Sequence, residues 1–120
     1  MGKPRILVID DEEIVRISCS RALDGEYEVD TASSGREGLE LLDKAEYDLA
    51  LIDLKMPGID GMEVLRTIKA GHPEVSVIMM TGYNTVEHVV DSISLGAAHY
   101  LEKPFTPDLL AEMIREVLGR

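Results

Sequence analysis

Five polar residues of this 120-residue chain stand where short apolar runs end: Asp10, Asp11, Asp53, Thr81 and Lys103. If those runs are strands of an open parallel sheet, their carboxyl ends meet at one edge of the sheet. Ligands of such sheets bind outside that edge, at the point where the strand order reverses. We therefore expect the five side chains to form one site.

The three aspartates of this group indicate which chemistry the site supports. Two like charges about 4 Å apart repel by about 4 kcal/mol at an effective dielectric near 20, so clustered carboxylates need a cation or a raised pKa. Oxygen ligands without clustered His or Cys favour magnesium, manganese or calcium over zinc. A site with few carboxylates and room for water and phosphate favours Mg²⁺, with Mn²⁺ as a substitute.

The elements that must position these residues follow from the hydrophobic pattern. Five short apolar runs alternate with segments of helical period, which predicts a single α/β domain over residues 1–120. Runs 6–9, 49–52 and 75–80 are nearly continuous, as expected for central strands that helices cover on both faces. The alternating segment 27–32 and the short segment 98–101 predict edge strands.

Apolar residues at helical spacing predict the helices and the faces that they bury. Thr106 is expected to cap the last helix with Pro107 at its first position, and Ser33 or Ser34 to cap the second. The expected buried sets are Ile14, Ile17 and Ala22; Leu39, Leu42 and Ala45; Met62, Leu65 and Ile68; Val86, Val89, Val90 and Ile93; and Leu109, Leu110, Met113, Ile114, Val117 and Leu118.

Composition excludes several classes of function. The formal net charge of -11 opposes direct binding to nucleic acid or to an anionic membrane. The apolar runs are far shorter than the roughly 20 residues of a membrane helix, and no signal-peptide core follows the first residues. A single cysteine, Cys19, excludes an internal disulfide and fits a reducing compartment. We therefore expect a cytoplasmic protein that contacts neither membrane nor nucleic acid.

Four motifs occur in order along the chain: IDDE at 9–12, IDLKMPGIDG at 52–61, MTG at 80–82 and YLEKP at 100–104. With these motifs the chain resembles, from end to end, the receiver domain of two-component response regulators, including the chemotaxis receiver. Segment 81–105 is also similar to receivers that precede ATPase-type transcription activators or occur in hybrid kinases. The resemblance implies a flavodoxin-like, doubly wound, five-stranded parallel sheet of order 2-1-3-4-5 with five helices.

The resemblance also assigns the acidic residues. It implies that Asp53 accepts a phosphoryl group and that Asp11, Asp53 and the backbone carbonyl of Lys55 bind Mg²⁺ directly. Asp10 would hold the ion through water. A carboxylate can attack phosphorus, and a divalent ion stabilises charge on the transferring oxygens.

Further roles concern the phosphoryl group once it has formed. Lys103, joined to Pro104 by a cis bond, would bind a phosphoryl oxygen. Thr81 would donate its hydroxyl to the phosphoryl group as Tyr100 turns inward. This shift would change the face built from the fourth helix, fifth strand and fifth helix.

Three positions would modulate the reaction. Gly82 would leave a path for the donor and for water, while Lys55 and Tyr83 would flank the phosphoryl group and set its lifetime. The predicted function is a signalling switch that catalyses its own phosphorylation and dephosphorylation without turning over an external substrate. Its donor would be a sensor histidine kinase or a phosphotransfer protein, and it would control an output protein or domain. A phosphorylation-dependent dimer is left open.

Two other functions compete with this prediction. A receiver-like adaptor would dock without phosphorylation, although such proteins usually lack the acceptor, the acids or the lysine. A magnesium-dependent phosphatase with an aspartyl nucleophile usually has a second Asp where this chain has Lys55. Taken singly, the site residues also have simpler interpretations: Asp10 or Asp11 as a helix cap, Thr81 as a turn residue, Lys103 as a solvated charge and Tyr100 as edge packing.

Overall fold

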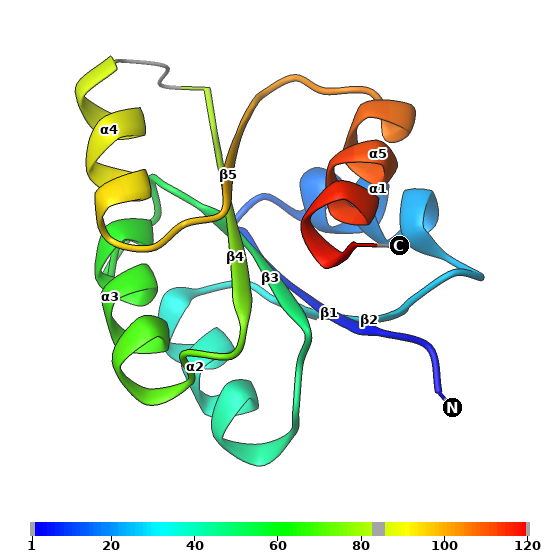
Figure 1. Ribbon diagram of the computed structural model, residues 1–120, viewed down its shortest axis with the longest axis horizontal. Helices are drawn as coiled ribbons and strands as arrows, with labels where there is room; N and C mark the ends of the chain where they lie inside the picture. Colours follow the sequence, from blue (N-terminus) through cyan, green and yellow to red (C-terminus); the bar gives the residue numbers. More distant parts are fainter. Residues whose placement is uncertain (1, 83–85, 120) are drawn as a thin grey trace.

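The computed structural model describes residues 2–82 and 86–119. Within these residues, five strands alternate with five helices along the chain (Figure 1). In order they are β1 (Arg5–Ile9), α1 (Glu13–Leu23), β2 (Glu28–Ala32), α2 (Gly35–Lys44), β3 (Leu49–Asp53), α3 (Gly61–Gly71), β4 (Ser76–Thr81), α4 (Val86–Ser94), β5 (His99–Glu102) and α5 (Pro107–Leu118).

The strands form one parallel sheet in the order β2-β1-β3-β4-β5. This confirms the expected fold class and strand order, with β1, β3 and β4 central and β2 and β5 at the edges. Because β1 and β3 are neighbours, Ile9 pairs with Ile52, and the residues that follow lie side by side. The reversal of strand order between β1 and β3 therefore places the ends of these two strands together.

The sheet carries a helical layer on each face. Helices α2, α3 and α4 cover one face and α1 and α5 the other (Figure 1). All five residues of β3 are buried, because successive side chains point to opposite faces and both faces are covered. Leu7, Ile9 and Ile52 belong to the core under α2 and α3, whereas Ile6 and Leu51 belong to the core under α1 and α5.

The predicted inner face of α1 is wrong for Ile14 and Ile17, whereas Ala22 is partly buried against the core as predicted. Ile14 is 68% exposed and Ile17 is 37% exposed, while Cys19 and Leu23 are buried and Val15 is partly buried. Val15, Cys19 and Leu23 are spaced four residues apart and form one stripe, and Ile14 lies about 100° round the helix from Val15. Apolar spacing located the helix correctly but not the face that packs on the sheet.

Helices α4 and α5 also expose apolar residues that were predicted to be buried. Val90 is 54% exposed and Ile93 is 49% exposed on α4, and Leu109 is 44% exposed on α5. The side chain of Val86 lies outside the described part of the chain. Within residues 2–82 and 86–119, every helix is too short or too polar to span a bilayer.

The predicted helix starts are confirmed at two caps. Ser34 accepts a hydrogen bond from the Glu37 amide at the start of α2, and Thr106 accepts one from the Leu109 amide at the start of α5. Pro107 occupies the first turn of α5, where its missing N–H costs nothing.

Candidate functional site

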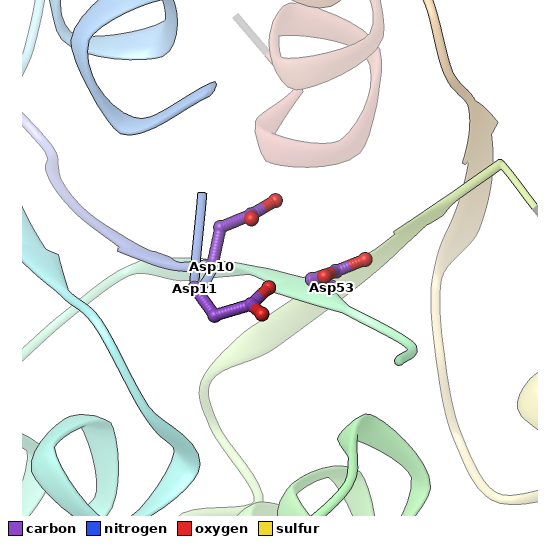
Figure 2. A group of neighbouring side chains, drawn as sticks. All are labelled: Asp10, Asp11 and Asp53. Carbon is purple, nitrogen blue, oxygen red and sulfur yellow. The ribbon is translucent and has the colours of Figure 1, made fainter. Parts of the chain in front are cut away.

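The predicted site residues lie together at the carboxyl edge of the sheet. Asp10 directly follows β1, Asp53 is the last residue of β3, Thr81 is the last residue of β4 and Lys103 directly follows β5. Asp10, Asp11 and Asp53 face a common space at this edge (Figure 2). The register of β3 and β4 pairs Asp53 with Met80, so the phosphoacceptor candidate lies beside the end of β4.

The three aspartates form a group that fits a divalent cation. One carboxylate oxygen from each of Asp10, Asp11 and Asp53 lies within 4.8 Å of the other two. Asp10 and Asp53 are buried, whereas Asp11 is exposed and leaves the group open to solvent. An oxygen-only donor set of this size suits a hard ion such as Mg²⁺, which keeps several waters when it binds.

The Lys103 ammonium lies next to two of the three aspartates, Asp10 and Asp53. Its Nζ lies 2.8 Å from Asp10 Oδ2, 3.2 Å from Asp53 Oδ1 and 3.3 Å from Glu12 Oε1. Burial lowers the pKa of Lys103, but the hydrogen bond to Asp10 and the charges of Asp10 and Asp53 more than offset this, and the pKa is raised. The ammonium therefore stays charged. The bond between Lys103 and Pro104 is cis, as the resemblance implied.

Asp53 is the carboxylate whose ionisation the site changes most clearly. The pKa of Asp53 is raised to about 6, first by burial and then by the charge of Asp10, while the charge and the hydrogen bond of Lys103 act in the opposite direction. A group with this pKa carries its full charge only above neutral pH, because the surroundings disfavour the anion. A divalent cation between the carboxylates would remove this penalty.

Three hydrogen bonds from β2, α1 and the loop between β1 and α1 hold Asp10 in place. Its backbone N–H donates to the carbonyl of Ala32 at 3.1 Å, and its Oδ1 accepts from the Glu12 amide at 2.8 Å. The Arg16 guanidinium donates to the Asp10 carbonyl oxygen at 2.7 Å. Asp10 Oδ1 thus accepts a hydrogen bond from a backbone amide just before α1, as the side chain of a helix cap does. Its other oxygen, Oδ2, accepts a hydrogen bond from Lys103.

Sequence reasoning missed both Glu12 and Arg16. Glu12 adds a fourth carboxylate to the site through its contact with Lys103. Arg16 binds back from α1 to the loop before it. The adjacency of Glu12 to the two aspartates was a usable signal, but its partner is 91 residues away in sequence. Nothing in the spacing of Arg16 marked it as a partner of a backbone carbonyl.

The loop after β3 fixes the backbone of Asp53. The Leu54 amide donates to Met80 O at 2.9 Å, and the Gly61 amide donates to Leu54 O at 2.9 Å. A Cβ on Gly61 would collide with the Asp53 carbonyl oxygen and lie 2.7 Å from Leu54 Cα, so only glycine permits this close approach of α3. Lys55 is exposed in this loop, two residues after Asp53.

The remaining predicted residues lie at the ends of β4 and β5. Thr81 is fully buried, and its hydroxyl forms a hydrogen bond with the half-buried Tyr100 hydroxyl. Burial raises the pKa of Tyr100, and the hydrogen bond to Thr81 opposes this. The Lys103 amide donates to Thr81 O at 2.8 Å, which ties the two strand ends together. Gly82 is exposed with open space beside its Cα, and Tyr83 lies outside the described residues.

Comparisons with known proteins agree with this architecture. Residues 6–115 match the response regulator receiver domain family. The chain is 33% identical over 119 residues to sporulation initiation phosphotransferase F of Bacillus subtilis, covering 98% of this chain and 96% of that protein. It is 36% identical over 117 residues to response regulator MprA of Mycolicibacterium vanbaalenii, covering 97% of this chain but only 51% of MprA. The chain thus spans nearly all of one relative and about half of the other.

A solved structure gives the same result in three dimensions. The CheY-like response regulator receiver domain protein of Methanospirillum hungatei superimposes with a TM-score of 0.94 at 37% identity, over 98% of this chain and 95% of that one. The chain therefore belongs to the response regulator receiver domain family.

Proposed function

We propose that the chain is a phosphorylation-dependent signalling switch and that Asp53 is the residue that accepts the phosphoryl group. The observation that carries the proposal is the placement of Asp53 next to the carboxylates of Asp10 and Asp11 and within 3.2 Å of the Lys103 ammonium. The buried carboxylate of Asp53 thus lies next to two acids that suit a divalent cation and next to one ammonium. This arrangement supplies a nucleophile and two sources of positive charge for an anionic donor.

The proposed transfer uses the carboxylate of Asp53 as nucleophile. One oxygen attacks the phosphorus of a phosphohistidine, the P–N bond breaks, and the leaving imidazole nitrogen keeps the electron pair and takes a proton from solvent. Asp11, Asp53 and the backbone carbonyl of Lys55 would hold Mg²⁺ directly, and Asp10 would hold it through water. The ion would neutralise charge on the transferring oxygens, and Mn²⁺ would substitute. Lys103 binds a phosphoryl oxygen. In dephosphorylation, water attacks phosphorus, and the Asp53 carboxylate and inorganic phosphate are released.

The proposed switch lies in the hydrogen bond between Thr81 and Tyr100. A phosphoryl group on Asp53 would compete with Tyr100 for the Thr81 hydroxyl. Tyr100 lies on β5, next to α4 and α5, so a change of its partner would alter the face that these elements form. That face would control the output protein or domain and would be the surface for any phosphorylation-dependent dimer.

The remaining modulating roles stay proposals. Gly82 would leave access to the phosphoryl group for the donor and for water. Lys55 and Tyr83 would set how long the group persists. The switch would work in the cytoplasm, where two-component signalling proteins receive their phosphoryl groups.

The donor would dock beside Lys103. A shallow groove at this place is lined by Glu12, Ile14, Val15, Ser18, Lys103, Pro104 and Phe105. Ile14, 68% exposed, gives the groove an apolar rim. A histidine kinase or phosphotransfer protein that delivers its phosphohistidine to Asp53 would cover this groove.

Intact mass spectrometry tests the proposal directly. After incubation with acetyl phosphate and Mg²⁺, the wild-type chain should gain one phosphoryl group, and Asp53→Asn should gain none. Asp43→Asn, a matched change at an exposed aspartate on α2, should behave as wild type. No uptake by the folded wild-type protein, or uptake by Asp53→Asn, would refute the assignment and favour a docking module that works without phosphorylation.

A further inference from the structure

The contacts of Lys103 involve a carboxylate that the proposed reaction does not use. An ammonium has three N–H donors, and the three oxygens within 3.3 Å of Nζ come from Asp10, Asp53 and Glu12. These acids come from two different strand ends and from the loop before α1. The Lys103 ammonium donates hydrogen bonds to Asp10 and Glu12 and forms an ion pair with Asp53, so it has three carboxylate partners.

The three partners differ in how readily they can leave. The side chains of Asp10 and Asp53 are 0% and 6% exposed, whereas that of Glu12 is 57% exposed. A buried carboxylate that loses its cation pays a large desolvation cost, while an exposed one is stabilised by water. Glu12 is therefore the partner that Lys103 can release most easily.

We propose that Glu12 competes with the phosphoryl group for Lys103 and so lowers the affinity of the site for that group. This inference rests on the proposed function of Asp53. A phosphoryl group on Asp53 offers several anionic oxygens. The contact that Lys103 makes with Asp53 can pass to one of them, and a second oxygen is bound most easily when Lys103 releases Glu12.

Glu12 is thus a positioning residue that acts through Lys103 and sets how strongly the site holds a phosphoryl group. Its neighbour Glu13 carries the same charge in the first turn of α1 and is exposed. Substitutions at the two positions change the charge near the site equally, but only Glu12 contacts Lys103 in the structure. A comparison of variants at Glu12 and Glu13 therefore separates the effect of the contact with Lys103 from the effect of removing a negative charge near the site.

The test measures equilibrium binding of beryllium trifluoride, a phosphoryl mimic, to the folded chain at saturating Mg²⁺. We expect Glu12→Gln to bind the mimic about two- to fivefold more tightly than Glu13→Gln, the range expected for an exposed ion pair. Glu12→Asp keeps the charge but shortens the side chain, and it should bind about as tightly as Glu12→Gln. In a Lys103→Gln background, Glu12→Gln and Glu13→Gln should have the same effect.

Several results would overturn the inference. Equal affinities for Glu12→Gln and Glu13→Gln, wild-type affinity for Glu12→Asp, or a persisting Glu12 effect without Lys103 would each do so. Failure of the wild-type chain to bind the mimic, together with failure to take a phosphoryl group from acetyl phosphate, would instead refute the function proposed for Asp53. Thermal unfolding of every variant provides the check that differences in affinity do not reflect loss of fold.

Discussion

The charged side chains at the two ends of the central strands are balanced differently. Near the amino ends of β1 and β3, Asp30 Oδ2 accepts from Arg5 at 3.0 Å and from the Tyr47 hydroxyl at 2.6 Å. The Arg5 guanidinium also lies 5.0 Å from the centre of the Tyr47 ring. Here the Asp30 carboxylate has two donors, and the Arg5 guanidinium balances its charge, while Asp48 accepts from the Arg5 backbone amide at 2.8 Å.

At the carboxyl ends, the carboxylates of Asp10, Asp11, Glu12 and Asp53 lie near the single ammonium of Lys103. Burial first, and the charge of Asp10 second, raise the pKa of Asp53. At the other end the residue with a raised pKa is Tyr47. Burial first, and the hydrogen bond to Asp30 second, raise the pKa of Tyr47 to about 12, so its hydroxyl remains a donor. The balanced cluster stabilises the fold, and the unbalanced one leaves a place for a cation.

Removal of Lys103 should produce the largest effect, because it takes away the ammonium that forms ion pairs with Asp10, Glu12 and Asp53. We expect Lys103→Met to slow phosphoryl uptake at least about 100-fold, the loss typical of a charge-stabilising donor. The metal-free protein should also lose about 3 kcal/mol of unfolding free energy, since buried Asp10 loses its partner. Mass spectrometry and urea unfolding measure the two effects. Lys44→Met on the surface of α2 is the control, and equal behaviour of both variants would contradict the comparison.

Neutralising Asp53 should stabilise the metal-free protein at high pH. Because the folded-state pKa of Asp53 is about 6 against an ordinary value of 3.8, its ionisation penalises the folded state fully above pH 6 and not at all below pH 4. Asp53→Asn should therefore raise the unfolding free energy by about 2 to 3 kcal/mol at pH 8. The difference should shrink as the pH falls from 6 towards 4. Urea unfolding of both proteins across this pH range measures the difference in unfolding free energy. A difference that grew or stayed constant as the pH fell would contradict the raised pKa of Asp53.

Magnesium should reduce the same imbalance by supplying the missing positive charge. At a tenfold excess over its dissociation constant, Mg²⁺ should stabilise the wild-type chain by about 1.4 kcal/mol. It should stabilise Asp53→Asn less, and thereby narrow the gap between the two proteins at pH 8. Thermal unfolding with potassium chloride at matched ionic strength is the control. Equal stabilisation of both proteins would place the ion elsewhere.

The smallest effect is expected at the balanced end. Asp30→Asn should lower the unfolding free energy by only about 0.5 to 1 kcal/mol, because Arg5 and Asp30 are 42% and 44% exposed. It should leave Mg²⁺ affinity and phosphoryl uptake unchanged. Urea unfolding and Mg²⁺ titration test this prediction. An altered Mg²⁺ affinity would show that the two ends are not independent.

Much of the fold could be predicted because its signals are local. Continuous apolar runs indicated the central strands, and Ser34 and Thr106 began their helices as expected. The buried face of α1 could not be predicted in the same way. Ile14 and Val15 are both apolar and adjacent, and the helix must rest on the sheet before one of them is covered.

In the candidate site, too, the residues at the strand ends could be predicted, but the contacts between distant side chains could not. The motifs placed Asp10, Asp53 and Lys103 at strand ends, and the parallel sheet brings such ends together by its geometry. The contact between Glu12 and Lys103, 91 residues apart, depends on side-chain directions that no motif contains. Arg16 is a similar case, since its partner is a backbone carbonyl that any residue type would provide.

The sequence by itself determined the alternation of strands and helices, the acidic residues at the strand ends and the family that these motifs indicate, because hydrophobic period and residue type are properties of neighbouring positions. Only the tertiary structure decided which carboxylates share Lys103, how far each is buried, and which apolar residues remain on the surface. Those properties arise from distances between segments remote in sequence, which exist only once the helices have packed on the two faces of the sheet.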